Sequence, residues 1–405
     1  MKDLDAELSR VAERESTVRA WVARHADDRL RQAYRTLPPG PLHGWSLGVK
    51  DVIDTADLPT ERGSAAHRGR TTTEDAVCVA LARRAGALVA GKTATTEFAL
   101  FNPTVTTNPH DRARTPGGSS SGSAAAVADG MVRAAFGTQT VGSVIRPAAY
   151  CGVVGFKPTH QLIQLTGVAS LAPTLDTVGW MTRSVADSAA VFEAMTGHRP
   201  VRSGGPVRIG SYRSHQWSQA EPAATVELER VIDRLSDAGI EIVEVDPLPH
   251  LEPVVAGSNA VLQYEIARVF SWEREHHLEA ISAPVRKMLA RADSVELETY
   301  RRAQVEIEAA RRRHDHWMAA NDIAGLLTPS APDEAPPIET TGDPVFNRTW
   351  TTLGVPAIHL PTGTGPSGLP VGVQLAGVRW SDADLLDVAA ALAAALDPGQ
   401  STPPT

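Results

Sequence analysis

A lysine and two serines in three separate segments have the side chains needed to cleave an amide bond. Lys50 follows the apolar run 45–49, Ser119 lies in a Gly- and Ser-rich loop, and Ser143 follows a second Gly-containing turn. Amide hydrolysis requires a nucleophile, a base that later protonates the leaving amine, and N–H donors for the oxyanion. A serine and a lysine supply the first two if burial or nearby positive potential keeps the lysine neutral. Backbone N–H groups in a Gly-containing turn supply the third.

The three segments resemble the signature of the amidase signature family. They read Gly-Val-Lys-Asp at 48–51, Pro-Gly-Gly-Ser-Ser-Ser-Gly-Ser-Ala at 116–124 and Gly-Thr-Gln-Thr-Val-Gly-Ser-Val-Ile-Arg-Pro at 137–147. The two key serines of the family are 24 residues apart, and 143 − 119 gives the same 24 here. The resemblance covers nearly the whole chain through further family-like segments at 85–93, 152–159, 175–179, 354–357 and 368–374.

The resemblance implies a role for each of these residues. Ser143 is expected to be the nucleophile, Ser119 a bridging serine after a cis peptide bond, and Lys50 the base that returns its proton to the leaving amine. The implied reaction hydrolyses a small amide to a carboxylic acid and ammonia or an amine, with no metal and no cofactor. The oxyanion hole is expected to use the backbone N–H groups of Thr140, Val141, Gly142 and Ser143.

Three residues near Ser143 bear on the substrate. The Gly-Ser-Val-Ile-Arg form resembles family members that act on small polar amides, such as malonamidase and related acid-amide hydrolases, so Arg146 is a candidate to hold a substrate carboxylate. A structural ion pair of Arg146 is an equal alternative. Gln139, where the family often has Asp, is a second candidate for substrate contact. Val141 replaces a usual glycine, so we expect a narrowed acyl pocket, and a strained turn if that position requires a positive φ.

Two alternatives to a hydrolase remain open. The same triad serves an acyl- or amidotransferase in which an amine or ammonia replaces water, and the glutaminyl-type tRNA amidotransferase subunit shares the signature. The chain is shorter than that subunit, and it has the Val-Ile-Arg form after Ser143. Both features favour hydrolysis. Val141 also permits a catalytically impaired protein that keeps only the scaffold.

Two further patterns are weaker. The segment 86–93 has the spelling of a P-loop, but its four intervening residues are an apolar, strand-like run, which disfavours nucleotide binding. His276-His277 and His314-Asp-His316 lie in charged, helix-like surroundings without third and fourth ligands at sensible spacing. We interpret both pairs as solvated helix faces.

Composition narrows the setting of the reaction. The 405 residues are 42% hydrophobic and 21% charged, with a net charge of −8, which disfavours a nucleic-acid or anionic-membrane partner. No apolar stretch is typical of a signal peptide or a membrane span, and two cysteines cannot build a disulfide framework. We expect a cytoplasmic enzyme whose partner is a small-molecule amide, with a homodimer as a candidate assembly.

Helix-like and strand-like segments alternate along the chain, with helices expected at 222–238 and 296–320 among others. We expect N-terminal helices in 1–36, a core with the catalytic residues in 44–190, a variable substrate-shaping region in 195–335 that begins with a connector at 195–206, and a return to the core in 340–396. This alternation is typical of a layered α/β fold. The resemblance implies one domain over 1–405, built on a large twisted mixed β-sheet with helices on both faces.

Overall fold

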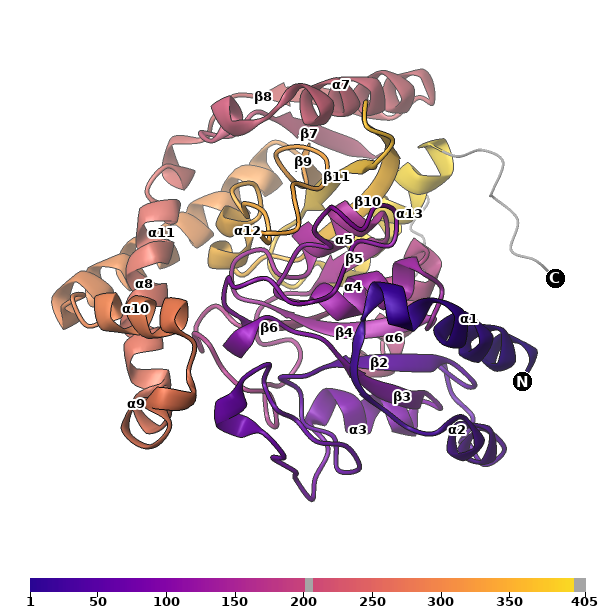
Figure 1. The fold of residues 1–405 in the computed structure, drawn as a ribbon. Coiled ribbons are helices and arrows are strands. Elements are labelled where there is room, and N and C mark those ends of the chain that lie inside the picture. The colour runs from indigo at the N-terminus through magenta and orange to yellow at the C-terminus, as the bar shows by residue number, and fades with distance from the viewer. Residues whose placement is uncertain (201–206, 397–405) are drawn as a thin grey trace.

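The structure is a computed structural model that describes residues 1–200 and 207–396. Residues 201–206, which fall in the predicted connector, and residues 397–405 lie outside the described residues. A single 11-stranded sheet runs through the molecule (Figure 1). Its strands are β1 (Trp21–Arg24), β2 (Ser46–Lys50), β3 (Leu88–Thr93), β4 (Ala134–Gln139), β5 (Val154–Lys157), β6 (Thr177–Thr182), β7 (Arg208–Tyr212), β8 (Glu241–Val245), β9 (Gly325–Pro329), β10 (Ala357–Thr364) and β11 (Pro370–Ala376).

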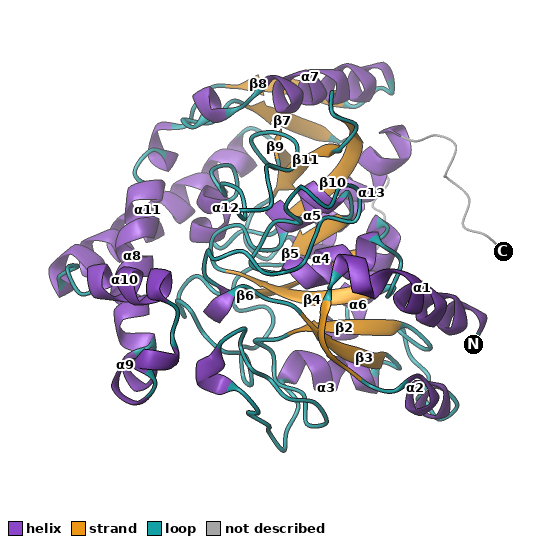
Figure 2. Ribbon diagram, in the orientation of Figure 1, coloured by secondary structure: helices purple, strands orange, loops and turns teal. Residues whose placement is uncertain are grey.

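Helices surround this sheet (Figure 2). Within the described ranges they are α1 (Lys2–Val18), α2 (Asp27–Tyr34), α3 (Val77–Arg84), α4 (Ser121–Ala128), α5 (Ile145–Cys151), α6 (Val185–Thr196), α7 (Pro222–Asp237), α8 (Val254–Val269), α9 (Ser271–His276), α10 (Ala283–Ala292), α11 (Leu297–Ala320), α12 (Arg348–Leu353) and α13 (Asp382–Leu396).

The sheet is mixed, as the resemblance implies. Its strand order is β1-β3-β2-β4-β6-β5-β10-β11-β9-β7-β8. β2 is parallel to both β3 and β4, and β7 is parallel to both β8 and β9. The strands between these two parallel groups are joined by antiparallel pairs from β4 through β6, β5, β10 and β11 to β9. Strands from the beginning, middle and end of the chain therefore share one sheet.

Both faces of the sheet are buried. Successive side chains of a strand point to opposite faces. In β9, Leu327 packs into the apolar cluster that includes α3, α6, α7 and α13, whereas Leu326 packs into the cluster of α11 and α12 on the other face. In β4, Phe136 packs into the first of these clusters, whereas its neighbour Ala135 packs on the opposite face with α1 and α4. This confirms the predicted sheet with helices on both faces.

The prediction of helices throughout 1–36 is wrong in one place. Between α1 and α2 the chain forms β1, which pairs antiparallel with β3. The first helix cannot continue to Trp21, because Arg19 has a left-handed backbone, with φ of 54°, and this ends α1. The reason is tertiary, because the edge of β3 offers β1 a hydrogen-bonding partner that the local sequence does not reveal.

The helices α8 to α11 form a lobe beside the sheet (Figure 1). α8 packs against α10, α11 and α12, so the lobe contacts the core through α12 and through the cluster that also contains Phe98, Val141 and Leu171. This lobe lies within the region 195–335 that we expected to shape the substrate pocket.

Candidate active site

Lys50 ends β2 in the interior of the sheet, between β3 and β4, and its side chain is fully buried. Its Nζ lies 2.8 Å from Ser119 Oγ, 2.8 Å from Thr138 Oγ1 and 3.4 Å from the Thr138 carbonyl oxygen. Thr138 lies on the neighbouring strand β4. The structure thus brings the predicted base and the predicted bridging serine into direct contact across 69 residues of sequence.

Burial lowers the pKa of Lys50 to about 7, since the ammonium form is poorly solvated inside the protein. The negative charge of Asp176 acts in the opposite direction, and the positive charge of Arg146 lowers the pKa further. An amine with this pKa is substantially neutral near neutral pH. Lys50 can therefore accept a proton there, which an ordinary surface lysine cannot.

Ser119 differs from the other serines of its loop. Ser120, Ser121 and Ser123 each donate their hydroxyl to a backbone carbonyl, whereas Ser119 has only the contact with Lys50 among the described side chains. The Gly118–Ser119 peptide bond is cis, as the resemblance implies. The hydroxyl of Ser119 is therefore the one in this loop that is free to relay a proton.

The turn from Thr140 to Ser143 carries four consecutive backbone N–H groups. Within the described chain, none of these four donates to a protein acceptor. The next two, of Val144 and Ile145, both donate to Gln139 Oε1, at 2.8 and 3.0 Å. The turn therefore presents unpaired donors immediately before α5, in an arrangement that suits an oxyanion.

Gln139 is fully buried, and all of its polar atoms are used within the protein. Its Oε1 accepts the two N–H groups at the start of α5, and its Nε2 donates to Thr351 Oγ1 at 2.8 Å. The suggestion that Gln139 contacts substrate is therefore corrected. Its amide fixes the end of the turn because it can accept and donate at once, which an aspartate cannot.

Ser143 ends this turn, two residues before α5, and 9% of its surface is exposed. Its hydroxyl makes no hydrogen bond to any described residue, so the structure joins Lys50 to Ser119 but does not show a bond from Ser119 to Ser143. The two serine segments nevertheless pack together. A Cβ on Gly117 would come within 2.7 Å of Pro147 in α5.

Arg146 is 1% exposed, and its Nη2 donates to the Gly118 carbonyl at 2.6 Å. The structural ion pair does not form, because Arg146 makes no salt bridge with a described residue. Its Nε and Nη1 are buried without a partner among the described residues. The observed contact holds α5 against the peptide bond that precedes Ser119, and a substrate role for Arg146 stays a prediction.

Val141 causes no backbone strain, because it is not among the described residues with positive φ. Its side chain is 5% exposed and packs with Phe98, Leu100 and Leu171. Its carbonyl accepts a hydrogen bond from Thr351 Oγ1 at 2.8 Å. The turn therefore accommodates a β-branched residue where the family usually has glycine, and the backbone argument for an impaired site does not hold.

Asp176 is a residue of the site that lies in the family-like segment 175–179 but was not among the candidate site residues. Its Oδ1 accepts the Thr140 hydroxyl at 2.6 Å, and its Oδ2 accepts the hydroxyl of Ser170 and the N–H groups of Leu171 and Ala172. It thus ties the turn 140–143 to the segment 170–172. Its place in the family-like segment 175–179, just before β6, was the sequence signal available.

We expect Asp176→Asn to lower kcat by about 10- to 100-fold, because one amide group cannot satisfy Thr140 and the three donors at Oδ2 together. The substitution also removes the charge that raises the pKa of Lys50. The acid limb of kcat/KM against pH should therefore move to lower pH, which a pH–rate profile measures.

Asp129→Asn is the matched control. Asp129 is also buried, but it pairs with Arg10 and Arg14 of α1. The Asp129→Asn substitution should lower the melting temperature without moving the acid limb of the pH–rate profile. An Asp176→Asn variant that loses stability but keeps the wild-type limb would show that Asp176 has no electrostatic influence on the site.

Two of the weaker patterns are settled by position. Lys92 of the P-loop spelling lies inside β3 and donates to the Ile53 carbonyl and to Thr60, so the segment is a strand and not a phosphate loop. His314 is buried on α11, with Nε2 against the Gly377 carbonyl, so its interpretation as solvated is wrong. The described residues contain no cluster of His, Cys, Asp or Glu suited to a metal ion.

Comparison with known proteins agrees with the fold and the motifs. The model of the Amidase family matches residues 4–386. A glutamyl-tRNA(Gln) amidotransferase subunit of Anaeromyxobacter sp. (strain K) is 33% identical, with 99% of this chain and 94% of the relative covered. A crystal structure of an amidase superposes with a TM-score of 0.88 at 30% identity, covering 97% of this chain and 95% of the other.

Native peptide amidase from Stenotrophomonas maltophilia superposes with a TM-score of 0.79 at 30% identity, covering 96% of this chain and 92% of the other. Fold and relatives together define an amide-cleaving α/β enzyme. The chain belongs to the amidase family, the family whose signature its three motifs carry. Among the described helices, none is both long and apolar enough to span a membrane.

Proposed function

We propose that this enzyme hydrolyses the C–N bond of a small amide through an acyl-enzyme on Ser143, with Lys50 as the base acting through Ser119. The contact between the buried Lys50 amine and the Ser119 hydroxyl, at 2.8 Å, carries this proposal. The lowered pKa of Lys50, to about 7, makes the same amine a base near neutral pH.

The surroundings of Lys50 Nζ fit a neutral amine. Such an amine has two N–H donors and one lone pair. The two N–H groups can donate to Thr138 Oγ1 and to the Thr138 carbonyl oxygen, which lie 2.8 and 3.4 Å from Nζ. The lone pair is then left for the hydroxyl proton of Ser119. This direction of hydrogen bonding leaves the Ser119 oxygen able to accept the proton of the nucleophile.

The proposed reaction follows from this order. Ser143 Oγ attacks the amide carbon while its proton passes to Ser119, and the proton of Ser119 passes to Lys50. The resulting oxyanion is stabilised by the free N–H groups of the turn 140–143. When the C–N bond breaks, Lys50 returns a proton through Ser119 to the departing nitrogen. Water then attacks the acyl-enzyme by the same relay and releases the carboxylic acid.

Transfer of the acyl group or of ammonia to another acceptor is the second candidate. The observation that favours it is a relative named as part of an amidotransferase, which is 33% identical over nearly the whole chain. The same acyl-enzyme serves both reactions, and they differ in which nucleophile reaches it.

The purified chain alone, tested on small amides, acid-amides, aryl amides and glutamine, separates the two candidates. We expect release of ammonia or amine with equal formation of free acid in water, without a partner protein. Turnover that appears only when a second protein or an acceptor amine is added would replace the hydrolase by a transferase.

We place the reaction in the cytoplasm, with a small-molecule amide as the partner. This is supported by two cysteines, Cys78 and Cys151, which are both buried and unpaired, as expected in a reducing compartment. A homodimer stays a prediction.

A further inference from the structure

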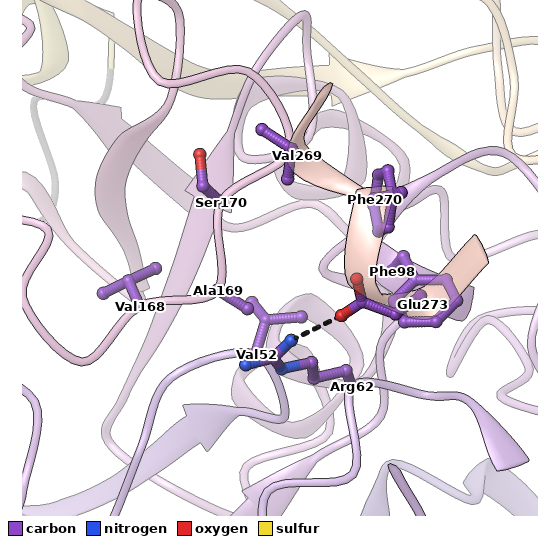
Figure 3. A pocket seen from close by; sticks show the side chains of 9 residues that line it. All are labelled: Val52, Arg62, Phe98, Val168, Ala169, Ser170, Val269, Phe270 and Glu273. Carbon is purple, nitrogen blue, oxygen red and sulfur yellow. Dashed lines mark hydrogen bonds and ion pairs between the residues drawn. The ribbon is translucent and has the colours of Figure 1, made fainter. Parts of the chain in front are cut away.

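A cavity of about 240 Å³ lies between the helical lobe and the core, and one of its walls is polar (Figure 3). Val52 and the segment 168–170 come from the core, whereas Val269, Phe270 and Glu273 come from the lobe. The cavity is smaller than the roughly 300 Å³ at which pockets for drug-sized ligands begin. A ligand that fits it is compact.

The cavity adjoins the segments that carry the proposed catalytic groups. The N–H of Val52 donates to the Lys50 carbonyl, and the Val52 carbonyl accepts the N–H of Ala169, both at 2.8 Å. Ser170, on the cavity wall, shares the carboxylate of Asp176 with Thr140 of the oxyanion turn. A substrate group in the cavity is therefore held by the same framework that holds the reacting groups.

The polar wall consists of Arg62 and Glu273. Glu273 is 5% exposed, and its Oε1 accepts both Arg62 Nη1 at 3.2 Å and His67 Nε2 at 3.0 Å. No other residue in the described part of the chain donates to its Oε2, which points away from Arg62 in Figure 3. Arg62 Nε is covered by protein atoms, whereas Nη2 has no acceptor among the described residues. The wall therefore offers the Nη2 donors beside a spare acceptor.

The backbone holds this wall in place. Arg62 has a φ of 57° and Phe98, also on the cavity, a φ of 53°, a region that side-chain-bearing residues rarely occupy. The Arg62 N–H donates to the Asp51 carbonyl, and the Arg62 carbonyl accepts the Phe98 N–H, both at 2.9 Å. Residues in such conformations cluster at active sites, ligand clamps and switch regions.

From this arrangement we propose that the cavity binds the acyl chain of the substrate, and that Arg62 and Glu273 bind a second carboxamide at its far end. The inference rests on the proposed function and names its substrate class, compact diamides. A carboxamide offers an oxygen to Arg62 and N–H groups to Glu273, so it satisfies both sides.

The other possible end groups fit less well. A terminal carboxylate faces the Glu273 charge, and a terminal ammonium faces the Arg62 charge, so each meets one like charge. An alkyl group displaces water from Arg62 and Glu273 but offers them no hydrogen bond. Their polar groups are then buried without partners, which is unfavourable. The seven other lining residues carry no charge, so the two charges on the wall cancel.

The test compares kcat/KM for four amides of similar size, butanediamide, succinamic acid, 4-aminobutanamide and pentanamide. For the wild type we expect butanediamide to exceed each of the others by at least about tenfold. Pentanamide is the internal reference, because general damage to the enzyme lowers its turnover as well.

Two substitutions should change the preference in opposite directions. Glu273→Gln leaves the Arg62 charge unopposed, so we expect the ratio of succinamic acid to butanediamide to rise by about tenfold or more. Arg62→Gln leaves the Glu273 charge, so the ratio for 4-aminobutanamide should rise instead. Glu265→Gln is the matched control, since Glu265 is a buried glutamate on α8 that binds Thr174 but does not line the cavity. Its ratios should equal those of the wild type.

Several outcomes overturn the inference. If Glu273→Gln and Arg62→Gln lower kcat/KM equally for all four amides, the ion pair serves only to hold the lobe against the core. If the wild type hydrolyses other amides well but prefers pentanamide within this set, the substrate class is wrong while the proposed function stands. Absence of Ser143-dependent turnover on every amide would reject the proposed function itself.

Discussion

Ser143→Ala should lower amide turnover by on the order of 10⁴-fold or more, because removal of the nucleophile eliminates the acyl-enzyme route. The side chain is small and its hydroxyl has no hydrogen-bond partner among the described residues, so its loss leaves no buried polar group unpaired. We therefore expect an unchanged melting temperature together with the loss of kcat. Ammonia or amine release, measured beside thermal unfolding, checks both parts.

Ser188→Ala provides the matched control for this substitution. Ser188 is a fully buried serine on α6, and its hydroxyl accepts the indole N–H of Trp180 at 2.8 Å. Its loss leaves that donor unpaired, so we expect about 1–3 kcal/mol lower stability with near-normal turnover. The opposite pattern, an active Ser143→Ala and an inactive Ser188→Ala, would remove Ser143 from the mechanism.

Lys50→Met should lower kcat/KM by about 10³- to 10⁵-fold, since the nucleophile loses the base that takes its proton. Methionine is apolar and of similar length, so the buried site should accept it. The folded pKa of Lys50, about 7, lies below its ordinary value of 10.5, so between these pH values the folded state binds fewer protons than the unfolded state. Stability contributed by this group therefore rises with pH through that window, and at neutral pH Lys50→Met should be no less stable than the wild type.

The wild-type pH profile gives a second readout of Lys50. Because the proposed base must be neutral, kcat/KM should fall as the pH drops through about 7 and reach a plateau above it. Lys157→Met is the matched control. Burial also lowers the pKa of Lys157 to about 7, but its Nζ donates to the Pro158 carbonyl and not to a serine. The acid limb should persist in Lys157→Met, and its disappearance there would mean that the limb reports another buried lysine.

Some parts of the molecule could be predicted because residues close together in the sequence determine them. The three motifs and the 24-residue spacing of Ser119 and Ser143 indicated the family and the mixed sheet, and the structure brings Lys50 to Ser119. The helices expected at 222–238 and 296–320 agree with α7 and α11 to within about one residue at each end, because the signals that favour a helix lie within each segment itself.

Other parts depend on partners distant in sequence. β1 exists because β3 offers it an edge, and Gln139 contacts α5 and Thr351 because α12 packs against the turn. Asp176 reaches Thr140 because β6 pairs with β4. Neither composition nor periodicity reveals such contacts. For the same reason the pairing of Arg62 with Glu273, 211 residues apart, could not be inferred from the sequence.

The central claim is that Ser143 becomes acylated with the help of Lys50 and Ser119. A fluorophosphonate, which forms a stable covalent adduct with an activated serine, tests it most directly when intact mass and peptide mapping follow the reaction. We predict a single adduct per chain, on the peptide that contains Ser143, absent in Ser143→Ala and formed far more slowly in Lys50→Met. An adduct on Ser119 or another residue, or full amide turnover by an enzyme that Ser143 modification does not inhibit, would contradict the account.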